Sequence, residues 1–103
     1  MKVKICGVTH PDDAHLVARL GADYIGIIFS PVSKRYVDIS LATKIAAAAH
    51  AAAAVPVAVF VDEDADTIIA AYHKTGCSII QLHGAGARRA LPKLAKYPLF
   101  IAF

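Results

Sequence analysis

The sequence has little charge and no block of charge of one sign. Only 18% of the 103 residues are charged, the net charge is +3, and basic residues adjoin only at Lys34–Arg35 and Arg88–Arg89. Nucleic-acid-binding domains usually carry a clustered basic face, so no nucleic-acid partner is expected. Apolar residues make up 57% of the chain, above the usual value of about 45–50%. This excess argues against disorder, and it predicts either a sheet buried on both faces or an apolar surface that binds a partner.

Cysteine is also scarce. Cys6 and Cys77 stand far apart and form no Cys-x-x-Cys or other metal-binding spacing. The start of the chain has no apolar core long enough for a signal peptide, and no uninterrupted apolar run approaches the roughly 20 residues of a membrane span. The sequence therefore predicts a soluble, cytoplasmic protein with reduced thiols, no membrane contact and no metal site. Four histidines form no triad or metal spacing and are interpreted as surface groups: His10, His15, His50 and His73.

Short apolar runs alternate with helix-like segments along the whole chain. The runs, which we predict to be strands, are Lys2–Cys6, Tyr24–Phe29, Val55–Val61, Ser78–His83 and Pro98–Phe103. The predicted helices are Ala14–Leu20, the alanine-rich segment Leu41–Ala54, a segment that begins in the acidic run Asp62–Asp66, and a short one near Pro92–Tyr97. Thr9 is the expected cap of the first helix, and Asp38 or Ser40 that of the second. Gly21 and Gly76 are expected to end the first and third helices.

The strict alternation of strand and helix predicts an α/β fold with a parallel sheet and right-handed crossovers. Alanine favours helices and lets a helix lie close to a sheet, so the alanine-rich segment is predicted to be a packed helix. A closed (β/α)8 barrel needs roughly 200 to 250 residues, about twice the length of this chain, which ends inside the fifth predicted strand. Two architectures remain open: a small doubly wound sheet, whose strand order has a switch point, or an incomplete barrel.

Several motifs occur together, in order, over the whole chain. They are Lys4–Thr9 (Lys-Ile-Cys-Gly-Val-Thr), Pro11–Ala14, Gly21–Gly26, Phe29, Pro31, Ser33–Val37, Val59–Val61 and Gln81–Gly84. This set resembles the amino-terminal half of the phosphoribosylanthranilate isomerases, which are (β/α)8-barrel (TIM-barrel) enzymes of tryptophan biosynthesis. The resemblance implies that residues 1–103 form a single partial-barrel domain, a half barrel of about five strands and four helices.

The resemblance also implies a reaction, an Amadori rearrangement that needs no cofactor. It converts N-(5-phosphoribosyl)anthranilate to 1-(2-carboxyphenylamino)-1-deoxyribulose 5-phosphate. A general acid protonates the furanose oxygen and opens the ring to a Schiff base, and a general base then removes a proton from the adjacent sugar carbon. By resemblance, that base is Cys6. A thiol serves as a base when nearby positive charge favours the thiolate, and strand alternation places Lys4 on the same side as Cys6.

Four residues are expected to bind the small-molecule phosphorylated sugar–anthranilate substrate. Arg35, in the loop after the second predicted strand, matches the family's arginine that engages the anionic substrate, and a guanidinium suits a carboxylate as a two-pronged donor. Gln81 and His83 share one face of the fourth predicted strand, and His83 ends it at the family's active-site rim. Lys4 is the fourth candidate. Cys77 precedes its strand, at the opposite end from the chemistry, and is interpreted as structural.

Parts of the family's pattern have no counterpart here. The general acid of the family is an aspartate on a strand beyond the fifth, and its phosphate site lies after strands seven and eight. Gly84–Gly86 is too short and generic to predict a phosphate loop rather than a turn. Asp62 stands at a strand end where the family usually has asparagine, and nothing in the sequence marks it as a proton donor.

Two further hypotheses remain. The chain is alternatively a truncated, non-catalytic half barrel that self-associates as a structural or binding domain. In either case the edges of the first and fifth strands are expected to be unpaired, which predicts a homodimer or association with a complementary half barrel. The third hypothesis is an unrelated flavodoxin-like binding module, which the strand order would reveal.

Overall fold

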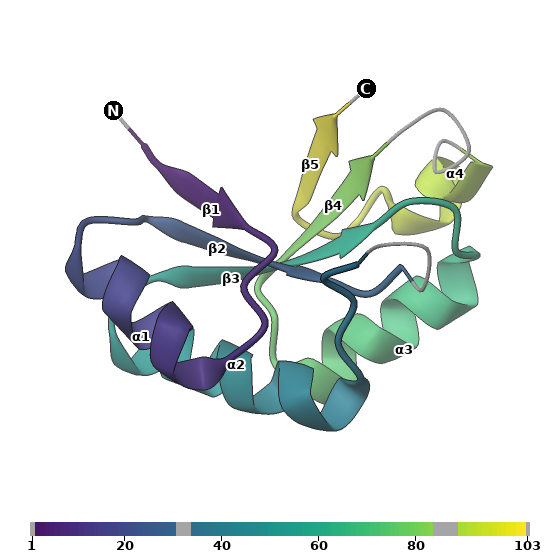
Figure 1. Cartoon of the computed structure of the whole chain (residues 1–103). Helices are drawn as coiled ribbons and strands as arrows, with labels where there is room; N and C mark the ends of the chain where they lie inside the picture. Colours follow the sequence, from purple (N-terminus) through teal and green to yellow (C-terminus); the bar gives the residue numbers. More distant parts are fainter. Residues whose placement is uncertain (1, 31–33, 84–88, 103) are drawn as a thin grey trace.

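Strands and helices alternate strictly along the described residues, as four βα units followed by a fifth strand (Figure 1). The computed structural model describes residues 2–30, 34–83 and 89–102. Within them the elements are β1 (Lys4–Cys6), α1 (Pro11–Arg19), β2 (Tyr24–Ile28), α2 (Ile39–Ala51), β3 (Val55–Phe60), α3 (Ala65–Thr75), β4 (Ile79–His83), α4 (Leu91–Leu94) and β5 (Leu99–Ala102). Every predicted strand and helix is present, with ends that differ by a few residues from those expected. No helix in these ranges is long and apolar enough to span a bilayer.

The five strands form one parallel sheet in the order β1-β2-β3-β4-β5. Each strand therefore lies beside the one that precedes it in the sequence, as in a barrel. A doubly wound sheet reverses its order at a switch point, and this sheet has none. The doubly wound, flavodoxin-like alternative is wrong.

The main helices α1, α2 and α3 all cover one face of the sheet (Figure 1). The side chains of Ala42, Ala46 and Ala49 on α2 are fully buried there. Small side chains let the helix approach the strands closely, as the alanine-rich sequence predicts. Phe60 at the end of β3 is also fully buried and stacks on Phe29, with ring centroids 5.2 Å apart.

Side-chain caps fix where the helices begin. Asp38 accepts from Leu41 N at 2.8 Å, which settles the choice between Asp38 and Ser40 at α2. The expectation for α1 is wrong, because the cap is His10 and not Thr9. His10 Nδ1 accepts from Asp12 N at 3.1 Å, since the imidazole nitrogen supplies the acceptor that the first-turn amides require.

The first and third helices also end as the sequence predicts. Gly76, with φ of +77°, is the left-handed cap of α3. Gly21, with φ of +111°, follows the end of α1.

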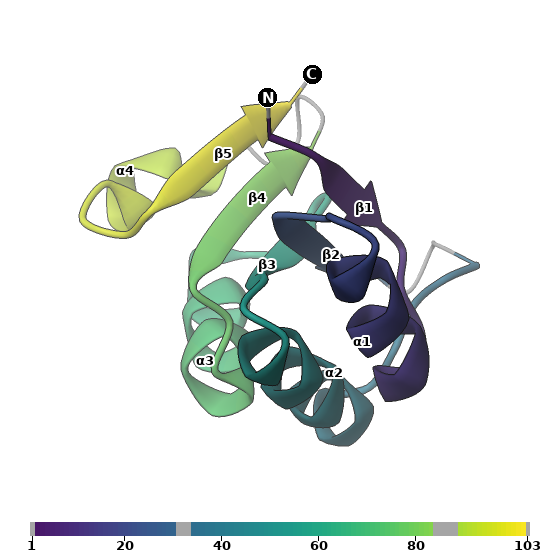
Figure 2. The ribbon, with the colours of Figure 1, turned by 90° about the vertical axis from the view of Figure 1, so that its left-hand side faces the viewer.

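The uncovered face of the sheet is strongly curled (Figure 2). In a flat sheet β1 and β4 would lie about 14 Å apart, at about 4.8 Å per strand. Nevertheless Lys4 Nζ on β1 donates a hydrogen bond to Gln81 Oε1 on β4. The rings of Tyr24 on β2 and Phe100 on β5 also meet edge to face, with centroids 5.2 Å apart. The strands thus wrap around a shared concave face, as barrel strands do.

Candidate functional site

Cys6 lies at the carboxyl end of β1, the edge at which parallel α/β folds place their chemistry. Its side chain is exposed. The backbone directly after it is held by one carbonyl group of the neighbouring strand: Gly7 N donates to Gly26 O at 3.0 Å and Val8 N donates to the same oxygen at 3.3 Å. The thiol therefore stands on an anchored turn, open to a molecule at this edge.

Arg35 reaches the same place from the loop after β2. Val37 N donates to Ile28 O at 3.1 Å, Tyr36 forms an isolated parallel bridge with Ile28, and the Val37 side chain is buried. These contacts tie the loop to the end of β2. From there the Arg35 side chain lies directly over Gly7, the residue next to Cys6. The structure thus brings Arg35 close to Cys6, although the two residues lie far apart in the sequence.

Lys4 and Gln81 form the floor of the concave face. Gln81 is 5% exposed, and its amide oxygen accepts from Lys4 Nζ. The same ammonium lies 5.8 Å from the centroid of the Phe100 ring, within the range of a cation–π contact. Lys4 thereby holds a fixed positive charge on the face that Cys6 shares, since residues two apart on a strand point the same way.

His83 is placed at the carboxyl end of β4, exposed, and on the same strand face as Gln81. Its ring is available to a ligand at the same edge as Cys6. Gly84–Gly86, considered above as a phosphate loop, lies outside the described residues. The other four histidines are exposed, as expected.

Cys77 is buried, whereas Cys6 is exposed. Cys77 is 5% exposed, and burial raises the pKa of its thiol to about 11, partly opposed by a hydrogen bond from the Thr75 hydroxyl. A thiol that stays protonated in an apolar setting is a poor base or nucleophile. Its interpretation as a structural residue agrees with this environment.

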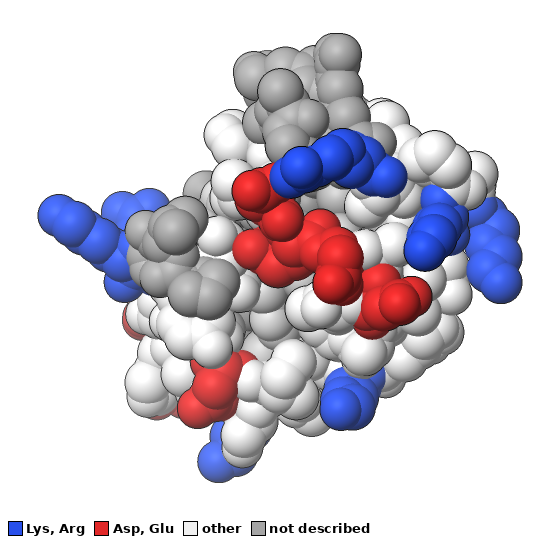
Figure 3. Space-filling view, turned by 90° about the vertical axis from the view of Figure 1, so that its right-hand side faces the viewer, with Lys and Arg blue, Asp and Glu red and all other residues white. Residues whose placement is uncertain are grey.

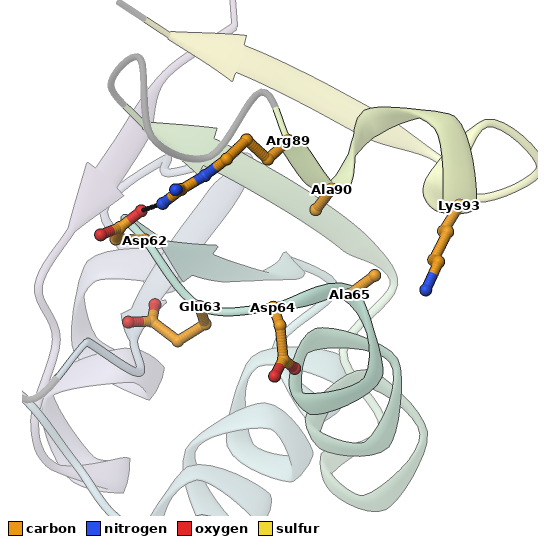
Figure 4. Close-up of a pocket in the computed structure, with 7 residues that line it drawn as sticks. All are labelled: Asp62, Glu63, Asp64, Ala65, Arg89, Ala90 and Lys93. Carbon is orange, nitrogen blue, oxygen red and sulfur yellow. Dashed lines mark hydrogen bonds and ion pairs between the residues drawn. The ribbon is translucent and has the colours of Figure 1, made fainter.

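Away from these residues, a cavity of about 290 Å³ lies between the loop after β3 and the start of α4 (Figure 4). Acidic side chains form a band on this side of the molecule, flanked by basic ones (Figure 3). Asp62 pairs here with Arg89 at 2.6 Å, and both side chains are mostly exposed. The Asp62 carboxylate is therefore engaged by a cation, which gives no support for a role as proton donor. Among the described residues no three His, Cys, Asp or Glu side chains gather as metal ligands.

Sequence reasoning missed three residues of the site. Gly26 lies beneath the Cys6 thiol, and the Tyr24 and Phe100 rings form a wall of the concave face. Alternation along β2 and β5 places Tyr24 and Phe100 on the same face as Lys4, so the pattern contained a signal for them. The close approach of the Cys6 side chain to Gly26 joins two strands, so the order of residues along the chain does not predict it.

Comparison with known proteins gives consistent matches. The family model for N-(5'-phosphoribosyl)anthranilate (PRA) isomerase matches residues 3–103. The N-(5'-phosphoribosyl)anthranilate isomerase of Chlamydia caviae is 51% identical over 96 residues, which are 93% of this chain and 47% of the relative.

Two solved structures share the fold. One shows monomeric forms of the dimeric phosphoribosylanthranilate isomerase from Thermotoga maritima (TM-score 0.87, 32% identity), and it is matched over 98% of this chain and 52% of its own length. The other is a phosphoribosylanthranilate isomerase bound to reduced 1-(o-carboxyphenylamino)-1-deoxyribulose 5-phosphate (TM-score 0.88, 31% identity), with the same coverage. The chain thus spans about half the length of the relatives it matches.

Proposed function

This chain belongs to the N-(5'-phosphoribosyl)anthranilate isomerase family, and from that premise we propose that it carries out the family's Amadori rearrangement in tryptophan biosynthesis. The substrate is N-(5-phosphoribosyl)anthranilate and the product 1-(2-carboxyphenylamino)-1-deoxyribulose 5-phosphate. One observation supports this most: the exposed Cys6 thiol lies at the carboxyl edge of the sheet, and the Arg35 side chain, from a separate segment, lies over the next residue, Gly7. A base beside a carboxylate-binding group is what this substrate requires.

Cys6 is the proposed general base. After ring opening the sugar carbon next to the Schiff base carries an acidic proton, and the Cys6 thiolate accepts it. The electron pair left on that carbon forms the enolamine, which tautomerises to the aminoketose: the carbon bonded to nitrogen gains a proton and the enol hydroxyl loses one. Lys4 on the same strand face and Arg35 beside Gly7 supply positive charge near the site of this step. The proton donor that opens the ring has no match in this sequence.

Arg35, Lys4, Gln81 and His83 are the proposed substrate-binding residues. The Arg35 guanidinium pairs with the anthranilate carboxylate as a two-pronged donor. Gln81 orients the Lys4 ammonium, and His83 offers a ring nitrogen at the rim. The relative bound to reduced 1-(o-carboxyphenylamino)-1-deoxyribulose 5-phosphate supports a phosphorylated sugar–anthranilate as the ligand class.

Each step is a proton transfer, so we propose that no cofactor takes part. A base of this kind requires a reduced thiol, and the two cysteines are free. We therefore place the reaction in the cytoplasm.

The sheet edges support association with another barrel segment. Val3 just before β1, Ile5 on β1 and Ile101 on β5 are 41%, 39% and 47% exposed. An apolar groove of about 200 Å³ beside β1 is lined by Val3, Ile5 and residues at the end of α1. We propose that a second copy or a complementary half barrel covers these edges, and the dimeric Thermotoga maritima relative is consistent with self-association.

The test is isomerase turnover by the purified 103-residue chain, with product identified by chromatography. Cys6→Ala is expected to abolish turnover, while Cys77→Ala, which removes the buried thiol, is expected to retain it. Equal turnover by the chain and by Cys6→Ala would refute Cys6 as the base. The non-catalytic half barrel would be favoured by two results together in a folded chain. The chain shows no turnover, and reduced 1-(o-carboxyphenylamino)-1-deoxyribulose 5-phosphate does not protect Cys6 from alkylation.

A further inference from the structure

Cys6 rests directly on the backbone of the neighbouring strand. Cys6 and Gly26 are register partners in the β1–β2 pair. A methyl group placed on Gly26 would lie 2.8 Å from Cys6 Sγ, 3.1 Å from its Cα and 3.2 Å from its Cβ. Carbon and sulfur atoms in contact normally stay about 3.5–4 Å apart. The thiol occupies space that any side chain at position 26 would fill.

Gly7 has a similar relation to Arg35. A methyl group on Gly7 would lie 2.5 Å from Arg35 Cδ and 3.1 Å from Nη1. Gly7 also has φ of +86°, in the left-handed region that disfavours other residues. Two separate physical features therefore disfavour any other residue here: the backbone turn after Cys6, and the Arg35 side chain, which would have to move away from a side chain at position 7.

Gly76 serves as a control that separates the backbone strain from the collision with Arg35. Its φ is +77°, close to that of Gly7, but a methyl group there would meet no atom within 4 Å. Substitution of Gly76 thus measures backbone strain alone, whereas substitution of Gly7 adds a collision with Arg35.

We propose that Gly26 and Gly7 are positioning residues of the site: Gly26 seats the Cys6 thiol, and Gly7 seats the Arg35 guanidinium beside it. This inference rests on the proposed function, in which these two groups act on one substrate. A methyl group at position 26 would force the thiol to move by roughly 1 Å, a displacement that costs on the order of 10²-fold in rate when it misplaces a reacting group.

Double-mutant cycles test the seating without any need for turnover. Gly26→Ala is expected to lower the urea midpoint, and this fall is expected to be at least roughly halved in a Cys6→Ala background, where Sγ is gone. Gly7→Ala is expected to cost more than Gly76→Ala, with the excess disappearing in an Arg35→Ala background. If Gly26→Ala does not fold, the double variant Gly26→Ala/Cys6→Ala is the test. Folding of the double variant supports the contact between Gly26 and the Cys6 thiol as the cause, and a double variant that also fails to fold overturns it.

Kinetics distinguish positioning from stability. Gly26→Ala, at a temperature where it is folded, is expected to lower kcat by about 10²-fold with little change in KM, and Gly7→Ala to raise KM. Gly76→Ala is expected to change neither. The pH dependence of Cys6 alkylation by iodoacetamide, followed by peptide mass spectrometry, is expected to change in Gly26→Ala and not in Gly76→Ala.

The results that would refute the positioning roles differ from those that would refute the proposed function. An unaltered alkylation profile or an excess cost that persists without Arg35 would overturn the positioning roles. Normal kcat in a folded Gly26→Ala variant would do the same. A chain without turnover whose cycles still show the expected coupling would refute the proposed function and leave the seating of the two side chains intact.

Discussion

Cys77 is expected to lower the free energy of unfolding at alkaline pH, and the substitution Cys77→Ala is expected to remove this effect. Burial raises the pKa of this thiol from its ordinary value of 9.0 to about 11, and the hydrogen bond from Thr75 opposes this in part. The side chain is 5% exposed and lies just before β4. Because a thiolate is costly in apolar surroundings, the folded chain keeps a proton that the unfolded chain loses.

The sign and size of the effect follow from that difference. Below pH 9.0 the thiol is protonated in both states, and its contribution to folding is fully present. Between pH 9.0 and about 11 only the unfolded state releases the proton, so the free energy of unfolding falls as pH rises. At about 1.4 kcal/mol per pH unit, the loss over this window is about 3 kcal/mol.

Urea unfolding of the wild-type chain and of Cys77→Ala, at pH values from 7.5 to 11 under reducing conditions, measures this loss. Other groups titrate in both proteins, so the informative quantity is the difference in unfolding free energy between them. We expect wild type to lose about 3 kcal/mol relative to Cys77→Ala across the window. Cys6→Ala, which keeps the buried thiol, is the matched control and is expected to show the alkaline loss. A difference between wild type and Cys77→Ala that stays constant from pH 8 to 11 would refute the reasoning.

Three further changes have defined outcomes. Asp38→Ala removes the acceptor for Leu41 N and is expected to cost about 1 kcal/mol in urea unfolding; an unchanged midpoint would contradict this capping role. Hydrogen bonds from Thr67 hold the pKa of Asp64 below its ordinary 3.8, so its contribution is present above pH 3.8 and is lost as pH falls below that value. Asp64→Asn is expected to show a smaller acid-induced fall in thermal midpoint than wild type. An equal fall in the two proteins would contradict this role of Asp64. Phe60→Ala is expected to cost about 3–5 kcal/mol because the ring is fully buried, with Phe60→Leu clearly milder; equal effects would argue against a cavity as the cause.

The order and type of elements were predictable because each depends on local chemistry. Apolar runs such as Val55–Phe60 identify buried parallel strands, and Asp38 and Gly76 mark helix ends through their own side chain or lack of one. The cap of α1 was not predictable in the same way. A hydroxyl at Thr9 and an imidazole at His10 are both acceptors, and only the folded backbone, in which His10 is the extended residue before the helix, shows which one caps it.

The site was predictable only in part. Alternation places Lys4 and Cys6 on one face of a strand, and the family resemblance indicates Arg35. The hydrogen bond from Lys4 to Gln81 spans two intervening strands, and it depends on how strongly the sheet curls. Sheet curvature arises from the twist of all the strands together, so no short motif encodes it. The close approach of Cys6 to Gly26 is likewise a property of two chains in register.

The sequential strand order also has a consequence for how the molecule assembles. Each strand pairs with its predecessor in the chain, so successive βα units can dock one after another, and contacts between near neighbours favour fast folding. Contacts across the concave face, such as Lys4 with Gln81, join residues 77 apart in sequence and require four strands already in place. Substitutions there are expected to accelerate unfolding and leave the folding rate nearly unchanged, which stopped-flow kinetics would show. The face proposed to hold the substrate is then the last part of the fold to form and the first to open.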